Sequence, residues 1–131
     1  MRILIVEDDL GSRKVLQNIL SSYGECDIAV DGEEAIEAFK LAWKEQMPYD
    51  LIFMDIMMPK VNGHEALRQI RIYESEAGVK PTEEVRVIMI TVLEDSKNVI
   101  TALYKGGAIA YIVKPIEKQK LITELKELGL I

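Results

Sequence analysis

The sequence predicts a single α/β domain in which one parallel sheet is covered by helices on both faces. The chain has 131 residues, which suits one hydrophobic core, since domains of roughly 100 to 200 residues are the usual scale. Short apolar runs alternate along it with segments whose apolar residues recur three and four positions apart. The first pattern is typical of strands buried on both faces, and the second of helices with one buried face.

The strands are predicted from short, mostly apolar runs. Four runs contain no polar alternation, which indicates strands of a parallel sheet covered on both sides. They span residues 3–6, 51–54, 87–90 and 111–113. A fifth run, residues 27–30, is more polar, as expected of a strand at the edge of the sheet.

The helices are predicted from apolar residues that fall on one face of each segment. In chain order these residues are Val15, Leu16, Ile19 and Leu20; Ala35, Ile36, Phe39 and Trp43; Leu67, Ile70 and Tyr73; Val99, Ile100, Leu103 and Tyr104; and Leu121, Leu125 and Leu128. Strand and helix therefore repeat five times. Because right-handed crossovers join parallel strands, such a chain winds into a three-layer sandwich with helices on both faces of the sheet.

The composition argues against several classes of protein. The chain carries 22 acidic and 16 basic side chains, for a net charge of −6, whereas direct nucleic-acid binding requires clustered Lys and Arg. Its single cysteine, Cys26, cannot form an internal disulfide, which favours a reduced, cytoplasmic setting. The apolar runs are far shorter than the ~20 residues that span a bilayer. We therefore expect neither a membrane segment nor direct contact with nucleic acid.

Polar side chains stand where the predicted strands end. Glu7 and Asp8 follow the first strand, Asp55 the third, Thr91 the fourth and Lys114 the last. The carboxyl ends of parallel strands meet at one edge of an open α/β sheet, and ligands bind at that edge. We therefore expect these residues to line a common crevice.

The residue types at this edge suit a divalent metal and a phosphoryl group. Three neighbouring carboxylates repel one another unless a cation lies between them, and an all-oxygen site with room for water favours Mg²⁺. Lys114 adds a mobile positive charge and Thr91 a hydroxyl donor for phosphoryl oxygens. Asp55 is the natural nucleophile, because the turn-rich loop of residues 58–63 can leave its carboxylate exposed.

Four segments in this order resemble the response-regulator receiver domain of two-component signalling. They are residues 3–8, residues 55–59 with Asn62 and Gly63, Thr91 after a buried strand, and Lys114 with Pro115. The resemblance covers nearly the whole chain and implies the strand order 2-1-3-4-5 of flavodoxin-like, CheY-like sandwiches. It also implies that a sensor histidine kinase hands a phosphoryl group from its phosphohistidine to an aspartate, with Mg²⁺ required. The chain would then be a phosphoacceptor switch that catalyses its own phosphorylation and dephosphorylation, and not an enzyme acting on other substrates.

By this resemblance, Asp55 corresponds to the phosphorylated aspartate, and four residues would hold the metal. Glu7 and Asp8 match the acidic pair, Asp55 adds its own carboxylate, and Met57 would give its backbone carbonyl. Glu7 replaces the commoner aspartate, which leaves open whether it touches the metal directly or through water.

The resemblance also assigns the residues that would sense and transmit phosphorylation. Thr91 matches the switch hydroxyl, Lys114 the lysine that contacts the phosphoryl group, and Tyr111 the aromatic side chain whose rotamer reports activation. The bond between Lys114 and Pro115 is expected to be cis, as in family members, and X-Pro bonds adopt cis at little cost.

We expect residues 1–131 to form a receiver domain without an output domain, because the last predicted helix reaches the end of the sequence. The output would then be another protein, bound by the face of the fourth helix, fifth strand and fifth helix. A monomer and a phosphorylation-dependent dimer are both open. So are an intermediate carrier in a multistep phosphorelay and a fragment of a longer regulator.

Two functions of other classes are less favoured. Mg²⁺-dependent phosphatases with an aspartyl nucleophile generally carry a second acid two residues further on, where Met57 stands, and a cap for which this chain has no insertion. In a flavodoxin-type redox protein, the acids Glu7, Asp8 and Asp9 would repel the flavin phosphate.

A further hypothesis concerns the lifetime of the phosphorylated state. Met57 and Leu93, two residues beyond Asp55 and Thr91 respectively, are apolar and cannot hold an attacking water by hydrogen bonds. They predict a long-lived acyl phosphate.

Overall fold

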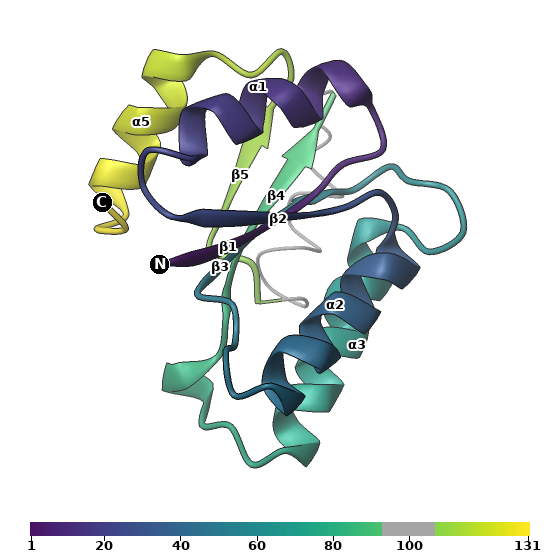
Figure 1. The fold of residues 1–131 in the computed structure, drawn as a ribbon. Coiled ribbons are helices and arrows are strands. Elements are labelled where there is room, and N and C mark those ends of the chain that lie inside the picture. The colour runs from purple at the N-terminus through teal and green to yellow at the C-terminus, as the bar shows by residue number, and fades with distance from the viewer. Residues whose placement is uncertain (93–106) are drawn as a thin grey trace.

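The chain folds as a five-stranded parallel sheet between helical layers, shown in Figure 1. The structure is a computed structural model, and it describes residues 1–92 and 107–131. Its strands are β1 (Arg2–Val6), β2 (Glu25–Ala29), β3 (Leu51–Asp55), β4 (Arg86–Thr91) and β5 (Ala110–Val113). Their order is β2-β1-β3-β4-β5, and every neighbouring pair is parallel. The predicted fold class and strand order are confirmed.

The described helices cover both faces of this sheet. They are α1 (Leu10–Leu20), α2 (Gly32–Lys44), α3 (Gly63–Glu76) and α5 (Lys118–Glu127), with a short 3-10 helix η1 (Pro81–Glu83) before β4. Figure 1 shows α1 and α5 on one face of the sheet and α2 and α3 on the other. The predicted fourth helix, with Val99, Ile100, Leu103 and Tyr104, lies outside the described residues. Among the described helices, none has the length and apolar character needed to cross a bilayer.

The core consists of two apolar clusters, one on each face of the sheet. Successive side chains of a strand point to opposite faces, so β1 contributes Ile3 and Ile5 to the cluster beneath α1 and α5, and Leu4 and Val6 to the cluster beneath α2 and α3. All four are fully buried, and each buried side chain of this size contributes about 1.5–3 kcal/mol. The absence of polar alternation in β1 therefore follows from helices covering both faces.

Two local expectations differ from the structure. The edge strand β2 spans Glu25–Ala29 instead of residues 27–30, because it is defined by its pairing with β1, from Arg2 opposite Glu25 to Val6 opposite Ala29. Val15 of α1 is 40% exposed. It lies roughly a quarter turn from the centre of the stripe formed by Leu16, Ile19 and Leu20, and that stripe alone faces the sheet.

Among the described helices that begin at the carboxyl edge of the sheet, three have a side-chain cap. Asp9 accepts a hydrogen bond from the Ser12 amide (2.8 Å), Asp31 from the Glu34 amide (2.8 Å) and Asn62 from the Glu65 amide (3.0 Å). Such caps satisfy otherwise unpaired N–H groups and contribute about 1 kcal/mol each. They also fix the points at which α1, α2 and α3 leave the edge where the polar residues gather.

A buried carboxylate of α3, Glu74, is ion-paired within the helix and connects it to Val85, the residue before β4. Glu74 is 1% exposed; its Oε1 accepts from Arg71 Nη1 (2.7 Å) and its Oε2 from the Val85 amide (2.7 Å). Arg71 Nη2 also donates to the Gly107 carbonyl (3.0 Å), just before β5. Burial raises the pKa of Glu74, although its hydrogen bonds to Val85 and Arg71 act in the opposite direction. This carboxylate therefore depends on partners from separate segments of the chain.

Replacing Glu74 by alanine is expected to lower the free energy of unfolding by about 3 kcal/mol, because the buried Val85 amide loses its acceptor and Arg71 loses a buried counter-charge. Urea denaturation at pH 7 measures this change. Glu76→Ala, on the exposed side of the same helix, serves as the control and should change stability by less than about 0.5 kcal/mol. Equal losses in the two variants would contradict this account of the ion pair.

Candidate functional site

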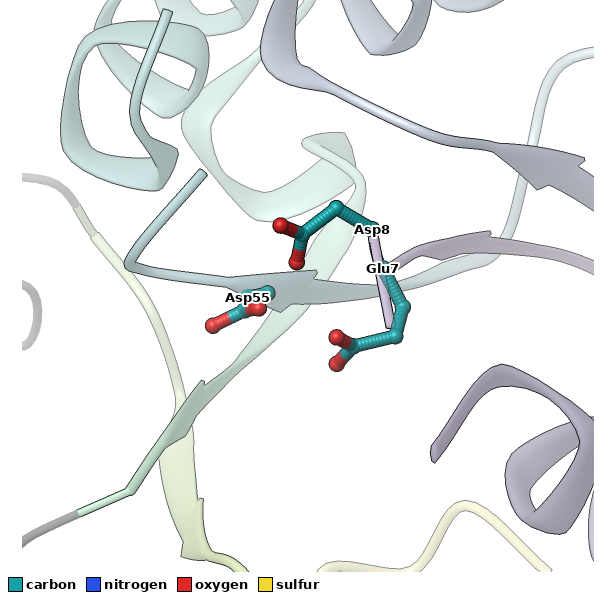
Figure 2. A group of neighbouring side chains, drawn as sticks. All are labelled: Glu7, Asp8 and Asp55. Atoms are coloured by element: carbon teal, nitrogen blue, oxygen red, sulfur yellow. The ribbon is translucent and has the colours of Figure 1, made fainter. Parts of the chain in front are cut away.

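The carboxyl edge of the sheet brings together the acidic residues that the sequence places after separate strands. One carboxylate oxygen from each of Glu7, Asp8 and Asp55 lies within 4.8 Å of the other two. Figure 2 shows the three side chains gathered where β1 and β3 end. They meet because β1 and β3 are neighbours in the sheet, with Val6 opposite Met54. The predicted juxtaposition of these acids is confirmed.

Glu7 is fully buried and uses only one of its two carboxylate oxygens. Oε1 accepts from Lys114 Nζ (2.9 Å) and from the Asp9 amide (3.0 Å). Oε2 is also buried, yet it has no hydrogen-bond partner among the described residues. The backbone of Glu7 also makes two hydrogen bonds. The Glu7 N–H donates to the Ala29 carbonyl (3.0 Å), and the Glu7 carbonyl accepts from Arg13 Nη1 (3.1 Å). A buried, unpaired carboxylate oxygen is costly and marks a place for a cation or a bound water.

Asp55, the last residue of β3, is only 3% exposed, so the expectation of an exposed carboxylate is wrong. Its Oδ1 accepts from the Met57 amide (3.2 Å), and its Oδ2 lies 3.4 Å from Lys114 Nζ. Burial raises the pKa of Asp55 to about 7, with the neighbouring Glu7 charge adding to the increase and Lys114 opposing it. The loop that follows β3 thus holds the carboxylate instead of leaving it free in solvent.

Lys114 and Thr91 lie at the same edge of the sheet, at the ends of the strands on the other side of β3 from β1. Lys114 follows β5, and its ammonium contacts both Glu7 and Asp55. Burial disfavours the charged form of this lysine, but its hydrogen bond to Glu7 and the charges of both acids outweigh that effect and raise the pKa of Lys114. Thr91, the last residue of β4, is 4% exposed, and its carbonyl accepts from the Lys114 amide (2.7 Å). The peptide bond between Lys114 and Pro115 is cis, as expected.

Two of the predicted site residues lie at the margin of this cluster. The Met57 side chain is 65% exposed, while its backbone N–H is bonded to Asp55. Tyr111 lies within β5, opposite Met89, and is 36% exposed. It lines a shallow surface pocket together with Glu124 of α5. Tyr111 therefore faces a surface between β5 and α5 and does not contribute to the acidic cluster.

The roles of two neighbouring residues are absent from the sequence-based prediction. The N-cap of α1 is Asp9, and neither Glu7 nor Asp8 caps this helix. Arg13, one turn into the helix, holds the Glu7 carbonyl. Asp9 stands directly before the first residue of a helical pattern, which is a recognisable cap signal, whereas no sequence pattern indicates the contact made by Arg13.

The site fits a hard divalent cation. Its candidate ligands are carboxylate oxygens, which Mg²⁺ prefers, and the unpaired Oε2 of Glu7 provides a buried acceptor with no other use among the described residues. Asp8 is exposed, so the acidic cluster is open to solvent on one side. A cation that enters there can also keep water ligands.

The sequence matches the response regulator receiver domain family over residues 3–126, and the chain belongs to this family. It is 36% identical over 126 residues to the probable transcriptional regulator ycf27 of Guillardia theta, covering 95% of this chain and 44% of that protein. It is 32% identical over 127 residues to a chemotaxis protein CheY homolog of Campylobacter jejuni, covering 97% of this chain and 91% of that protein. The chain therefore spans less than half the length of the first relative and nearly all of the second.

Solved structures agree with this placement. A chain of the CheX-CheY-BeF3-Mg²⁺ complex from Borrelia burgdorferi has a TM-score of 0.83 at 30% identity, covering 100% of this chain and 90% of that chain. A chain from the co-crystal of the Saccharomyces cerevisiae phosphotransfer protein Ypd1 with the receiver domain of Ssk1 has a TM-score of 0.82 at 29% identity, covering 98% and 88% respectively. The chain is thus a response regulator receiver domain with a CheY-like fold.

Without divalent metal, Asp55→Asn is expected to raise the free energy of unfolding at pH 8 by about 1–3 kcal/mol. An acid whose pKa is raised on folding, here from 3.8 to about 7, costs stability as the pH rises through that interval, because the unfolded chain ionises more readily. The gain should therefore shrink towards pH 4. Urea denaturation at several pH values in EDTA measures it.

Glu37→Gln is the control for this measurement, because its carboxylate is exposed and lies outside the acidic cluster, so the substitution should change stability little. A stability gain for Asp55→Asn that is the same at pH 4 and pH 8 would show that burial of its charge is not the cause.

Proposed function

We propose that Asp55 accepts a phosphoryl group from the phosphohistidine of a sensor histidine kinase or a phosphotransfer protein. The observation that carries this proposal is a buried carboxylate in contact with one lysine and two further acids, at the ligand-binding edge of a receiver fold. The bond from phosphorus to the imidazole nitrogen breaks as the bond from phosphorus to an Asp55 oxygen forms. The imidazole leaves with the electron pair. Because the attacking group is a carboxylate, no general base is needed.

Glu7, Asp8 and Asp55 would hold Mg²⁺, with the Met57 carbonyl as a further ligand. Of the two Glu7 oxygens, Oε2 is the one available, since Oε1 already accepts from Lys114 and Asp9. When bound, the ion neutralises charge on the transferring phosphoryl group. The complex from Borrelia burgdorferi that contains Mg²⁺ supports the choice of ion.

The side chains of Lys114 and Thr91 would contact the oxygens of the phosphoryl group directly. The Lys114 ammonium lies 3.4 Å from Asp55 Oδ2 and can follow the charge as it moves onto the transferred oxygens. The Thr91 hydroxyl would be drawn towards the phosphorylated site. These residues would let the chain promote its own phosphorylation and dephosphorylation.

The downstream partner would bind the face formed by β5 and α5, together with the fourth helix that the sequence predicts. Tyr111, 36% exposed on this face, is the candidate side chain to turn inward when Thr91 moves. The partner would be another protein and not nucleic acid, and phosphorylation could act through a monomer or a dimer. Cytoplasmic location and the lack of an output domain remain predictions.

A phosphorelay intermediate is the second candidate function. The co-crystal of the phosphotransfer protein Ypd1 with a receiver domain supports it, because the same acyl phosphate can return its phosphoryl group to a histidine. Transfer from the phosphorylated chain to a purified histidine phosphotransfer protein would distinguish this route from direct signalling.

Incubation with acetyl phosphate and Mg²⁺, followed by intact-mass measurement, tests the proposed phosphorylation. Wild type should gain one phosphoryl group, and Asp55→Asn or removal of Mg²⁺ with EDTA should abolish the gain. Asp50→Asn, an exposed acid just before β3, is the control and should label normally. Equal labelling of Asp55→Asn would refute the assignment, and steady turnover of p-nitrophenyl phosphate would favour a phosphatase instead.

The phosphorylated form is expected to be long-lived because the exposed Met57 side chain cannot hold an attacking water. Leu93, the second residue of this hypothesis, lies outside the described residues. Met57→Asn combined with Leu93→Glu should speed loss of the phosphoryl group by about tenfold or more, measured as decay of the phosphorylated mass after removal of acetyl phosphate. Met47→Asn, at an exposed methionine that precedes β3 and so lies beyond the opposite end of that strand from Asp55, should leave the decay unchanged. An unaltered rate in the double variant would reject the hypothesis.

A further inference from the structure

The loop that follows Asp55, residues 56–62, packs against the start of α2. Gly32, the first residue of α2, is buried. A Cβ placed on it would lie 2.2 Å from the Val61 carbonyl oxygen and 2.9 Å from Val61 Cβ. Such distances are far below van der Waals contact, and the nearest atom belongs to the backbone. Only glycine therefore lets α2 and this loop approach so closely.

The residue before Gly32 reaches the same loop. Asp31 is 5% exposed; one oxygen caps α2, and the other lies 3.7 Å from Lys60 Nζ. Lys60 has φ 64°, in the left-handed region that costs a non-glycine residue energy. Because the lysine side chain is 66% exposed, the ion pair adds little stability. Its contribution is to the position of the loop.

The far end of the loop is held by the start of α3. The Gly63 amide donates to the Ile56 carbonyl (2.9 Å), and a Cβ on Gly63 would lie 2.3 Å from the Asp55 carbonyl oxygen. The loop is thus fixed against α2 near Val61 and against its own beginning through Gly63. Between these points, the Met57 amide bonds to Asp55 Oδ1 (3.2 Å). A displacement of the loop that moves the Met57 amide would therefore change this hydrogen bond to the carboxylate.

We propose that Gly32 and Asp31 are positioning residues for the phosphoacceptor: the closely packed start of α2 sets the place of residues 56–62, and through the Met57 amide it sets the Asp55 carboxylate. Neither residue belongs to the acidic cluster. The expected effects on Mg²⁺ affinity and on phosphorylation rest on the proposed function. The expected effect on the position of the loop does not.

Gly32→Ala tests this proposal by nuclear magnetic resonance of the ¹⁵N-labelled chain. Without metal, the amide signals of Met57 and Asp55 should shift, because the alanine must push Val61 away. Titration with Mg²⁺ should then show an affinity about tenfold lower than wild type, the loss that follows when the partners that orient metal ligands are disturbed. Phosphorylation by acetyl phosphate should slow in parallel.

Gly24→Ala is a matched control. Its added Cβ would lie 2.5 Å from the Met1 carbonyl oxygen, which is the same kind of clash with backbone, but next to the opposite ends of β1 and β2. It should destabilise the fold without moving the Met57 signal or the Mg²⁺ affinity. An equal loss of Mg²⁺ affinity in Gly24→Ala would overturn the proposal, as would an unshifted Met57 signal in Gly32→Ala.

Asp31→Asn provides a second measurement if Gly32→Ala does not fold. Asparagine keeps the helix cap but removes the charge that faces Lys60, so the Met57 signal should shift with little change in stability. An unchanged Met57 signal in Asp31→Asn would count against a positioning role. Failure of the wild type to accept phosphate on Asp55 would refute the proposed function alone, because the loop signals are measured without phosphate or metal.

Discussion

The contact of the Lys114 ammonium with two buried carboxylates is the interaction on which the candidate site depends. Glu7 and Asp55 are both almost fully buried, and two such acids at close range would repel each other and resist ionisation. The ammonium, 2.9 Å from Glu7 and 3.4 Å from Asp55, offsets part of that cost. It leaves one Glu7 oxygen without a partner among the described residues, and it opposes without cancelling the effect of burial, which raises the pKa of Asp55. The cluster is therefore stable enough to fold and still favours the arrival of a cation.

The parallel sheet makes this arrangement possible because it separates the stable part of the molecule from the reactive part. Apolar clusters on both faces of the strands supply the stability, and Glu74 joins α3 to the beginning of β4 by a fully partnered carboxylate. At the other ends of the strands, the carboxylates are only partly compensated. The two buried glutamates are therefore under different constraints. Glu74 has protein partners for both oxygens, whereas Glu7 has none for Oε2 among the described residues.

Three capped helix starts among the described residues, those of α1, α2 and α3, support the same arrangement at the reactive edge. Each is capped by a short polar side chain, so each helix begins at a defined residue and holds the preceding loop close to the sheet. The start of α1 follows Glu7 and Asp8 directly, and the starts of α2 and α3 enclose residues 56–62. Small shifts of these helices would consequently alter distances within the acidic cluster, because the intervening connections are short and bonded to backbone.

The class of fold and most of the candidate site could be predicted from local patterns. Apolar runs without alternation identify strands such as β3, and the polar residue after each strand identifies the reactive edge, since parallel strands bring their carboxyl ends together. Tertiary packing decided the rest. Asp55 is buried, Glu7 pairs with Lys114, and Gly32 fits against Val61 because segments far apart in the chain approach within a few ångströms. Periodicity describes one segment at a time, whereas burial, ion-pair partners and close backbone contacts are properties of two segments that only the folded chain brings together.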